Sequence, residues 1–282
     1  IASCLVGSEM CIRDSYSRHT RVTTSYAPHA PYTVSDDSMT SIITNAEELD
    51  VPIHMHIHET AGEITQSVEQ YGVRPLERLK DLGLLSPRLT AVHMTQLTDE
   101  EINWCAEAGV HIAHCPTSNL KLASGFSPIV KLAQHNVNIT IGTDGAASNN
   151  GLDMFAEMKQ TALLAKAVAH DASAIPAHAA LEMATINAAK SLGLDDKIGS
   201  IEVGKVADLI AVDLNNIENQ PCYDVISQLV YATGRDKVTD VWVEGKTLLK
   251  DRQLTTLNQH KVIETAQVLS LIHISEPTRQ EA

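Results

Sequence analysis

Residues 51–60 read VPIHMHIHET, with a histidine at three alternate positions and a glutamate directly after the last one. Alternation is the periodicity of a β-strand, so His54, His56 and His58 are predicted to share one face, with Glu59 where the strand ends. The positions between them form the apolar opposite face: Val51, Ile53, Met55 and Ile57. This stretch therefore predicts a strand that presents imidazoles on one side and packs on the other.

Imidazole is a common metal ligand, and a carboxylate beside an activated water can carry protons. Two alternatives need no metal: a histidine-rich strand at a solvated edge, or histidines that are hydrogen-bonded within a polar core. Three histidines at alternate positions, followed by a carboxylate, favour the metal site over both alternatives.

The composition excludes several classes of protein. The chain has 282 residues, 44% of them hydrophobic, and a formal net charge of −14, which argues against nucleic acid or an anionic membrane as a partner. No apolar run reaches the roughly 18 residues of a spanning helix. The five cysteines form no CxxC pair, as expected of free thiols in a reducing cytosol, so we expect a cytoplasmic protein.

The two ends of the chain look unlike the rest. Residues 5–15 (LVGSEMCIRDS) and 269–279 (LSLIHISEPTR) can be encoded by DNA strands that are reverse complements of each other. Such a pair resembles a translated sequencing adapter rather than a fold signal. We therefore expect residues 1–15 and 269–282 to be artefacts and exclude both from the reasoning about the fold.

Between these ends, strands and helices are predicted to alternate. Strands are expected over residues 21–27, 51–58, 89–93, 110–115 and 137–143, and helices over 35–46, 60–71, 75–83, 98–109, 127–134, 152–170 and 176–192. A loop is expected at 116–125. This order predicts βα units with a parallel sheet. The strands at 207–214 and 238–249 lack crossover helices and predict a small β domain.

Polar residues fall where successive predicted strands end. They are His29, His56 with Glu59, His93, His114 and Asp144. Alternation places His93 on the same face as Leu89 and Ala91. In a βα barrel the carboxyl ends of the strands converge on one mouth, where catalytic residues lie. The series therefore predicts a metal site at that mouth.

Six stretches carry a more specific resemblance. The chain resembles the amidohydrolase superfamily, and within it the group of methylthioadenosine/S-adenosylhomocysteine deaminases. The stretches are APHAPYTVSD, VPIHMHIHETAGEI, AVHMTQLTDEEI, HCPTSNLKLASG, IGTDGAASNNGLDMFAEMK and GSIEVGKVADLIAVD, in the order of the family.

The resemblance implies an α/β fold: a partial (β/α)8 TIM barrel, about strands 4–8, followed by the remnant of a small β-sandwich domain. Residues 16–195 would form the partial barrel and residues 196–268 the C-terminal segment. The family has an HxH pair of metal ligands on barrel strand one, and this sequence has no counterpart. We therefore expect a fragment that lacks the N-terminal third and that is inactive by itself.

By the same resemblance, His56 and Asp144 are metal ligands, and Glu59 is the general acid and base. His93 orients the attacking water, and Asp144 accepts its proton. His29 contacts the substrate, together with Glu59 and Asp144. His54 would lie deeper in the barrel and His58 near its rim; Asn119 and Lys121 would lie in a loop that borders the nucleoside, with their roles open.

The implied reaction is hydrolytic deamination of the adenine ring of S-adenosylhomocysteine or 5-methylthioadenosine, with release of ammonia. The implied cofactor is one Zn²⁺ per subunit, with Fe²⁺ or Mn²⁺ as alternatives. The partner would be a small nucleoside, with a homo-oligomer as a further expectation. Two readings compete: another amidohydrolase, such as a guanine deaminase or a triazine chlorohydrolase, and a non-catalytic barrel remnant.

Overall fold

The histidine stretch forms the first strand of a four-stranded parallel sheet. The computed structural model describes residue 19 and residues 21–275, so the first expected artefact, residues 1–15, lies outside the described residues, as do residues 276–282. The strands are β1 (Ile53–Ile57), β2 (Leu89–His93), β3 (His111–His114) and β4 (Asn138–Ile141), hydrogen-bonded in that order. Each pair is parallel, which confirms the prediction of βα units.

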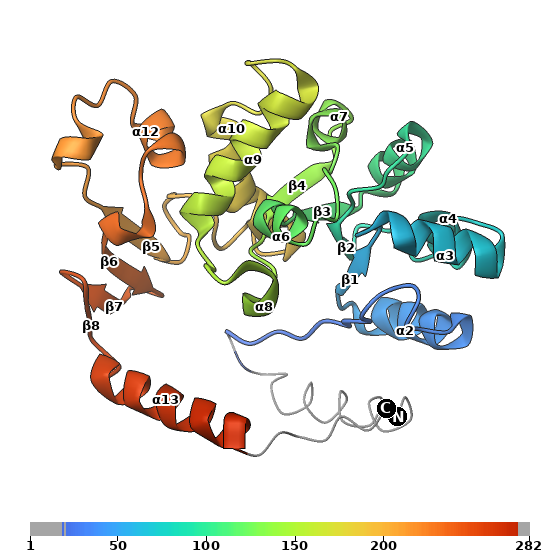
Figure 1. Ribbon diagram of the computed structural model, residues 1–282, viewed down its shortest axis with the longest axis horizontal. Helices are drawn as coiled ribbons and strands as arrows, with labels where there is room; N and C mark the ends of the chain where they lie inside the picture. Colours follow the sequence, from blue (N-terminus) through green and yellow to red (C-terminus); the bar gives the residue numbers. More distant parts are fainter. Residues whose placement is uncertain (1–18, 20, 276–282) are drawn as a thin grey trace.

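Helices precede, connect and follow these strands, most of them outside the sheet in an arc (Figure 1). They are α2 (Asp36–Leu49), α3 (Ala61–Tyr71), α4 (Pro75–Asp81), α5 (Asp99–Ala108), α6 (Pro116–Lys121), α7 (Ile129–Gln134), α8 (Ala146–Asn149), α9 (Met154–Ala169), α10 (Ala177–Ala184) and α11 (Ile186–Ser191). Crossover helices of this kind are what parallel strands need for their connection.

Local sequence explains where several helices begin. The hydroxyls of Ser35, Thr60 and Thr98 each accept a hydrogen bond from a backbone N–H of the first turn of α2, α3 and α5. At α5 the side chain of Glu101 also accepts from the Thr98 N–H, which completes the capping box that the sequence TDEE of residues 98–101 predicts. Pro75 begins α4, where its missing N–H costs no helical hydrogen bond.

The apolar face of β1 packs against the helices. Ile53, Met55 and Ile57 are each at most 3% exposed and belong to one large hydrophobic core. The same core includes Leu89, Ala91, Ile112 and Ile139 from the other three strands. The sheet therefore has a helix side, filled by this core, and an opposite side that carries His54 and His56.

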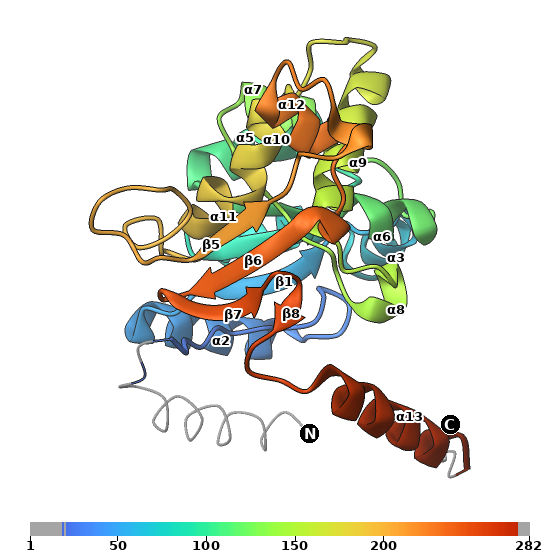
Figure 2. The same ribbon diagram turned by 90° about the vertical axis from the view of Figure 1, so that its left-hand side faces the viewer.

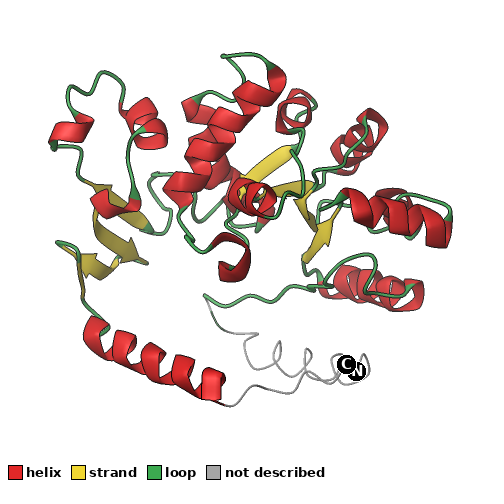
Figure 3. Ribbon diagram, viewed as in Figure 1, coloured by secondary structure: helices red, strands yellow, loops and turns green. Residues whose placement is uncertain are grey.

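A second, antiparallel sheet follows, formed by β5 (Leu209–Val212), β6 (Val238–Val243), β7 (Lys246–Lys250) and β8 (Gln253–Leu254). Figure 2 looks onto this sheet, and Figure 3 shows it separated from the parallel one. Glu244 and Gly245 join β6 to β7 with positive φ angles of 50° and 72°, as in a tight hairpin turn. Helix α12 (Val225–Tyr231) lies between β5 and β6, and α13 (Gln259–Ser275) follows β8.

The structure corrects three predictions. The strand expected at 21–27 is reduced to one parallel bridge between Tyr26 and Ile53. The loop expected at 116–125 begins with helix α6, because Pro116 occupies its first turn. The long helix expected over 176–192 is two helices, α10 and α11, which are divided at Thr185 (φ −128°, ψ −95°).

Within the described residues, no helix combines the length and the apolar character needed to cross a bilayer.

Replacement of Ile112 by Ala tests the role of the helix-side core. Ile112 is 0% exposed, so Ile112→Ala is expected to lower the free energy of unfolding by about 2–5 kcal/mol, measured by urea unfolding. The matched control is Ile210→Ala in β5, where the side chain is 55% exposed, with an expected loss within about 0.5 kcal/mol. Equal losses would contradict the assignment of the core.

Candidate metal centre

Three side chains from the carboxyl ends of the parallel strands come together. His56 of β1, His93 of β2 and Asp144, which follows β4, each present one ligand atom, and these atoms lie within 4.8 Å of one another. The sequence predicted this convergence. It is the one such group of three or more histidines, cysteines or carboxylates found among the described residues.

The ring of His56 is held by a backbone carbonyl. Its Nδ1 lies 2.7 Å from the carbonyl oxygen of His29, and the His56 backbone N–H donates to the same oxygen at 3.2 Å. A carbonyl can only accept, so Nδ1 carries the proton and Nε2 keeps its lone pair. A histidine whose second nitrogen is fixed in this way is typical of metal ligands.

The ring of His93 is held by an amide. Its Nδ1 donates to Oδ1 of Asn119 at 2.8 Å, and the ring is stacked on that of His56, with 5.5 Å between centroids. Its Nε2 lies 3.9 Å from Glu59 Oε2 and 4.0 Å from Asp144 Oδ2. These separations exceed hydrogen-bond length, which leaves room for a reacting atom between the ring and the two carboxylates.

Two hydrogen bonds fix the carboxylate of Asp144. The hydroxyl of Ser118 donates to Oδ2 at 2.7 Å, and the Gly145 N–H donates to Oδ1 at 2.7 Å. Partial burial alone would raise the pKa of Asp144, but these two bonds and the nearby His93 and His56 lower it below its usual range. Asp144 is therefore ionised at neutral pH, as a cation ligand should be.

A second carboxylate holds the turn that carries Glu59. The side chain of Glu63 accepts from the backbone N–H groups of His58 and Glu59, at 2.9 and 2.8 Å. Burial raises the pKa of Glu63. The carboxylate of Glu59 itself is 25% exposed and faces His93. Residues 60–63 read TAGE, which is the spacing of a capping box, and this signal for Glu63 was overlooked in the sequence.

Left-handed backbone at the strand ends corrects two predictions. His58 has φ 54°, and its ring turns to the helix side, where Nε2 accepts from the Leu76 N–H at 3.0 Å and the side chain is 0% exposed. It therefore does not share a face with His56 or lie near a rim. His93 has φ 75°, so its ring stacks on His56 rather than sharing a face with Ala91.

The remaining predicted residues take different places. His29 is exposed, and its ring lies 5.3 Å from that of His56. Lys121 donates to the carbonyl of Ala147 and to Asn150 Oδ1, so it anchors the α8 segment. His114 is buried, and its neighbour along β3, Ile112, belongs to the helix-side core, which places His114 on that side, away from His56.

Sequence reasoning missed Ser118 and left the role of Asn119 open. Both stand in the stretch HCPTSN, directly after β3, and both contact the cluster through side-chain hydrogen bonds. Their signal was the polar pair Ser-Asn at a strand end. Because the Pro- and Gly-containing pattern of residues 116–125 predicts a loop, the positions of both residues on α6 could not be inferred.

Comparison with known proteins relates this chain to one family. Residues 13–248 match the model of the amidohydrolase family. A 5-methylthioadenosine/S-adenosylhomocysteine deaminase from Teredinibacter turnerae is 51% identical over 255 residues, which are 90% of this chain and 58% of that protein. A 5'-deoxyadenosine deaminase from Methanosarcina mazei is 42% identical, over 88% of this chain and 57% of that protein. The chain thus spans less than two thirds of these relatives.

Solved structures share the fold. A crystal structure of an adenosine deaminase from Xanthomonas campestris with bound zinc has a TM-score of 0.94 and 50% identity, and covers 96% of this chain and 62% of that one. An atrazine chlorohydrolase from Arthrobacter aurescens complexed with zinc has a TM-score of 0.85 at 24% identity, and covers 95% and 60%. The second likeness concerns the fold alone.

The buried His114 is expected to make stability depend on pH. Burial lowers its pKa from 6.5 to about 4, so the unfolded chain binds a proton at higher pH than the folded chain does. The contribution of the neutral His114 to the free energy of unfolding is fully present above about pH 6.5 and is lost as the pH drops towards 4. Over this range the wild type is expected to lose about 3 kcal/mol more than His114→Leu does.

Urea unfolding between pH 4 and 7 measures this difference. The exposed His260→Leu variant is the control and is expected to follow the wild type. A His114→Leu variant with the same pH dependence as the wild type would contradict the burial of a neutral imidazole.

Proposed function

This chain belongs to the amidohydrolase family, and we propose that a protein of its relatives' full length deaminates the adenine ring of S-adenosylhomocysteine or 5-methylthioadenosine. The reaction is hydrolytic and releases ammonia. The observation that carries the proposal is the cluster of His56, His93 and Asp144 with Glu59 beside it, in which each imidazole has a fixed Nδ1 and a free Nε2.

The donor set fits a divalent metal, and we propose one Zn²⁺. Zinc takes imidazole nitrogen and carboxylate oxygen, and its catalytic sites keep at least three protein ligands. His56 and Asp144 are the proposed ligands in this chain. By the family pattern, the other protein ligands would be an HxH pair on barrel strand one, which has no counterpart among the described residues. We therefore propose that this chain binds zinc weakly and turns over no substrate by itself.

The described side chains can move the protons of the reaction. When bound, a divalent ion lowers the pKa of its water from 15.7 to about 7. His93 Nε2 and the Asp144 carboxylate lie 4.0 Å apart, so both can contact one water, and the ionised Asp144 accepts its proton. Glu59, 3.9 Å from His93, donates to N1 of the ring as the nucleophile attacks C6. The proton held by Asp144 then passes to the amino group, which leaves as ammonia, while Glu59 regains a proton from the new hydroxyl group on C6. His29 contacts the substrate.

The domain boundaries follow from the same proposal. We propose that the partial (β/α)8 barrel spans residues 16–195, of which the structure describes residue 19 and residues 21–195. The strands β1 to β4 would be its strands five to eight, with the Tyr26 bridge at the place of strand four. Residues 196–268 form a segment of the small β domain. The proposed partner is a small nucleoside, and the proposed compartment is the cytoplasm.

Zinc titration of this chain tests the metal ligands. His56→Asn and Asp144→Asn are expected to lose saturable binding in isothermal titration calorimetry, because each removes one of few ligands. Asn119→Ala is expected to weaken binding less than either of these, because Asn119 holds the ring of His93 and is not a proposed ligand. The control is His54→Asn, two residues away on β1 and outside the cluster. Equal loss in the control would contradict the site.

The test of activity uses a protein of the relatives' full length. We would obtain that protein from the source DNA and assay ammonia release from S-adenosylhomocysteine, 5-methylthioadenosine and guanine. Glu59→Gln is expected to lower kcat by at least about 100-fold while zinc content stays unchanged, because Glu59 moves protons and binds no metal. Activity on guanine alone would contradict the proposed substrates and leave the proposed mechanism in place. A zinc-free, inactive protein would favour the non-catalytic remnant.

A further inference from the structure

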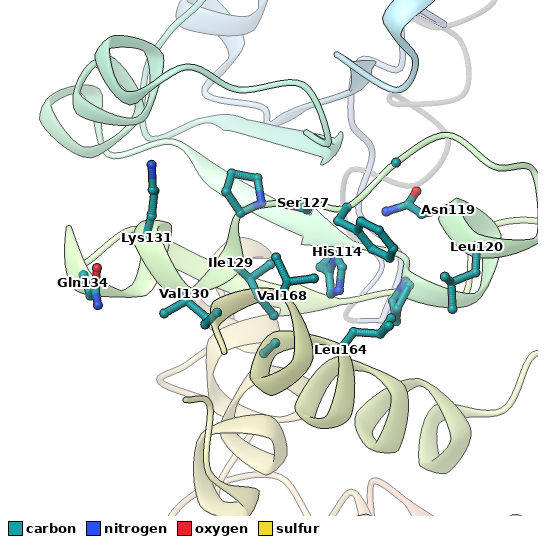
Figure 4. Close-up of a pocket in the computed structure, with 16 residues that line it drawn as sticks. His114, Asn119, Leu120, Ser127, Ile129, Val130, Lys131, Gln134, Leu164 and Val168 are labelled. Carbon is teal, nitrogen blue, oxygen red and sulfur yellow. The ribbon is translucent and has the colours of Figure 1, made fainter. Parts of the chain in front are cut away.

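A cavity of about 290 Å³ lies behind the end of β3, between the segment that joins α6 to α7 and helix α9. Figure 4 shows His114 near its centre, with Asn119 and Ser127 on one side and Leu164 and Val168 on the other. Ile112, on the same face of β3 as His114, belongs to the helix-side core, whereas Ala113 of β3 and Cys115 directly after it pack with Val92 in a separate cluster. The cavity is therefore distinct from the metal centre.

Its walls are largely apolar. Ile129 of α7 and Leu164 and Ala165 of α9 line it. Phe126 and Val168 also line it and remain 53% and 46% exposed, at the side open to solvent. An apolar cavity of this size, with a few polar groups, has the character of a small-ligand site at the lower end of the usual range.

Three buried side chains in the lining have polar atoms without a hydrogen-bond partner among the described residues. They are both ring nitrogens of His114, Nδ2 of Asn119 and Oγ of Ser127. The three residues are 4%, 2% and 5% exposed. Buried polar groups are nearly always hydrogen-bonded, so a cluster of unpaired ones indicates a partner that the protein itself does not supply.

The lining favours a neutral partner. Burial keeps His114 uncharged, so its ring offers one donor and one acceptor. Lys131 alone of the described lining residues carries a charge, and its Nζ lies 2.5 Å from Asp99 Oδ1, in an exposed ion pair. Asn119 adds a donor, and Ser127 adds a donor or an acceptor.

We propose that this cavity binds a small neutral heteroaromatic molecule, of the size of one fused bicyclic ring, that carries a ring N–H and a ring acceptor. The apolar walls enclose the ring, and its polar edge pairs with His114, Asn119 and Ser127.

Asn119 connects this site to the metal centre. Its Oδ1 accepts from His93 Nδ1 at 2.8 Å, and its Nδ2 is the atom left unpaired. A ligand that accepts a hydrogen bond from Nδ2 fixes the amide plane, and with it the acceptor that orients His93. Binding is therefore expected to change the NMR signals of the His93 ring, although the ligand does not touch that ring.

Benzimidazole is the probe for the test, because it is neutral at pH 7.5 and has one ring N–H and one ring acceptor. Titration of the full chain is expected to show saturable binding of one molecule, with and without Zn²⁺. Indene, which has the shape without the nitrogens, and the cationic 1,3-dimethylbenzimidazolium are expected not to bind. Equal binding of indene, or binding that requires Zn²⁺, would overturn the proposal.

Two variants locate the bound probe. Ser127→Ala is expected to weaken binding about three- to tenfold, as for loss of one hydrogen bond, whereas Ser41→Ala on the exposed face of α2 leaves binding unchanged. His114→Leu is expected to abolish binding and yet raise Tm, because it removes two unpaired buried nitrogens. Undiminished binding by both Ser127→Ala and His114→Leu would overturn the site.

Discussion

The metal centre depends on left-handed backbone at the ends of the strands. His58, His93 and Asp144 have φ angles of 54°, 75° and 59°, where side chains other than glycine are strained. The turn at His58 sends its ring into the helix layer, and the turn at His93 brings its ring out of that layer to His56. The cost of each conformation is offset by hydrogen bonds that only this geometry allows, such as the one from Leu76 N–H to His58.

Orientation then comes from groups that are not themselves ligands. The carbonyl of His29 holds one ring nitrogen of His56, and the side-chain amide of Asn119 holds one ring nitrogen of His93. The hydroxyl of Ser118 holds one carboxylate oxygen of Asp144. Each leaves one side-chain atom of these residues directed at the common centre, and the two bonds to ring nitrogens fix the imidazole tautomers before any ion arrives. Glu63 does the same for the turn that carries Glu59. The orienting groups therefore come from the segments that follow β1 and β3 and from the His29 turn that precedes β1.

Sequence reasoning predicted the parts that follow from periodicity and capping. The strand at β1, the capping box at Thr98 and Glu101, and the convergence of His56, His93 and Asp144 all follow from local patterns or from the parallel order of strands. Alternation failed at His58 and His93, because a single positive φ reverses the side of the sheet that a residue faces. The role of Asn119 could not be inferred, because its contact with His93 spans 26 residues.

The most direct measurement is a crystal structure of this chain soaked with Zn²⁺, with anomalous diffraction recorded at the zinc edge. A zinc peak is expected about 2.0–2.2 Å from both His56 Nε2 and a carboxylate oxygen of Asp144, with the Nδ1 atoms of His56 and His93 still bonded to His29 and Asn119. A peak bound elsewhere, with His56 and Asp144 free of metal, would contradict it.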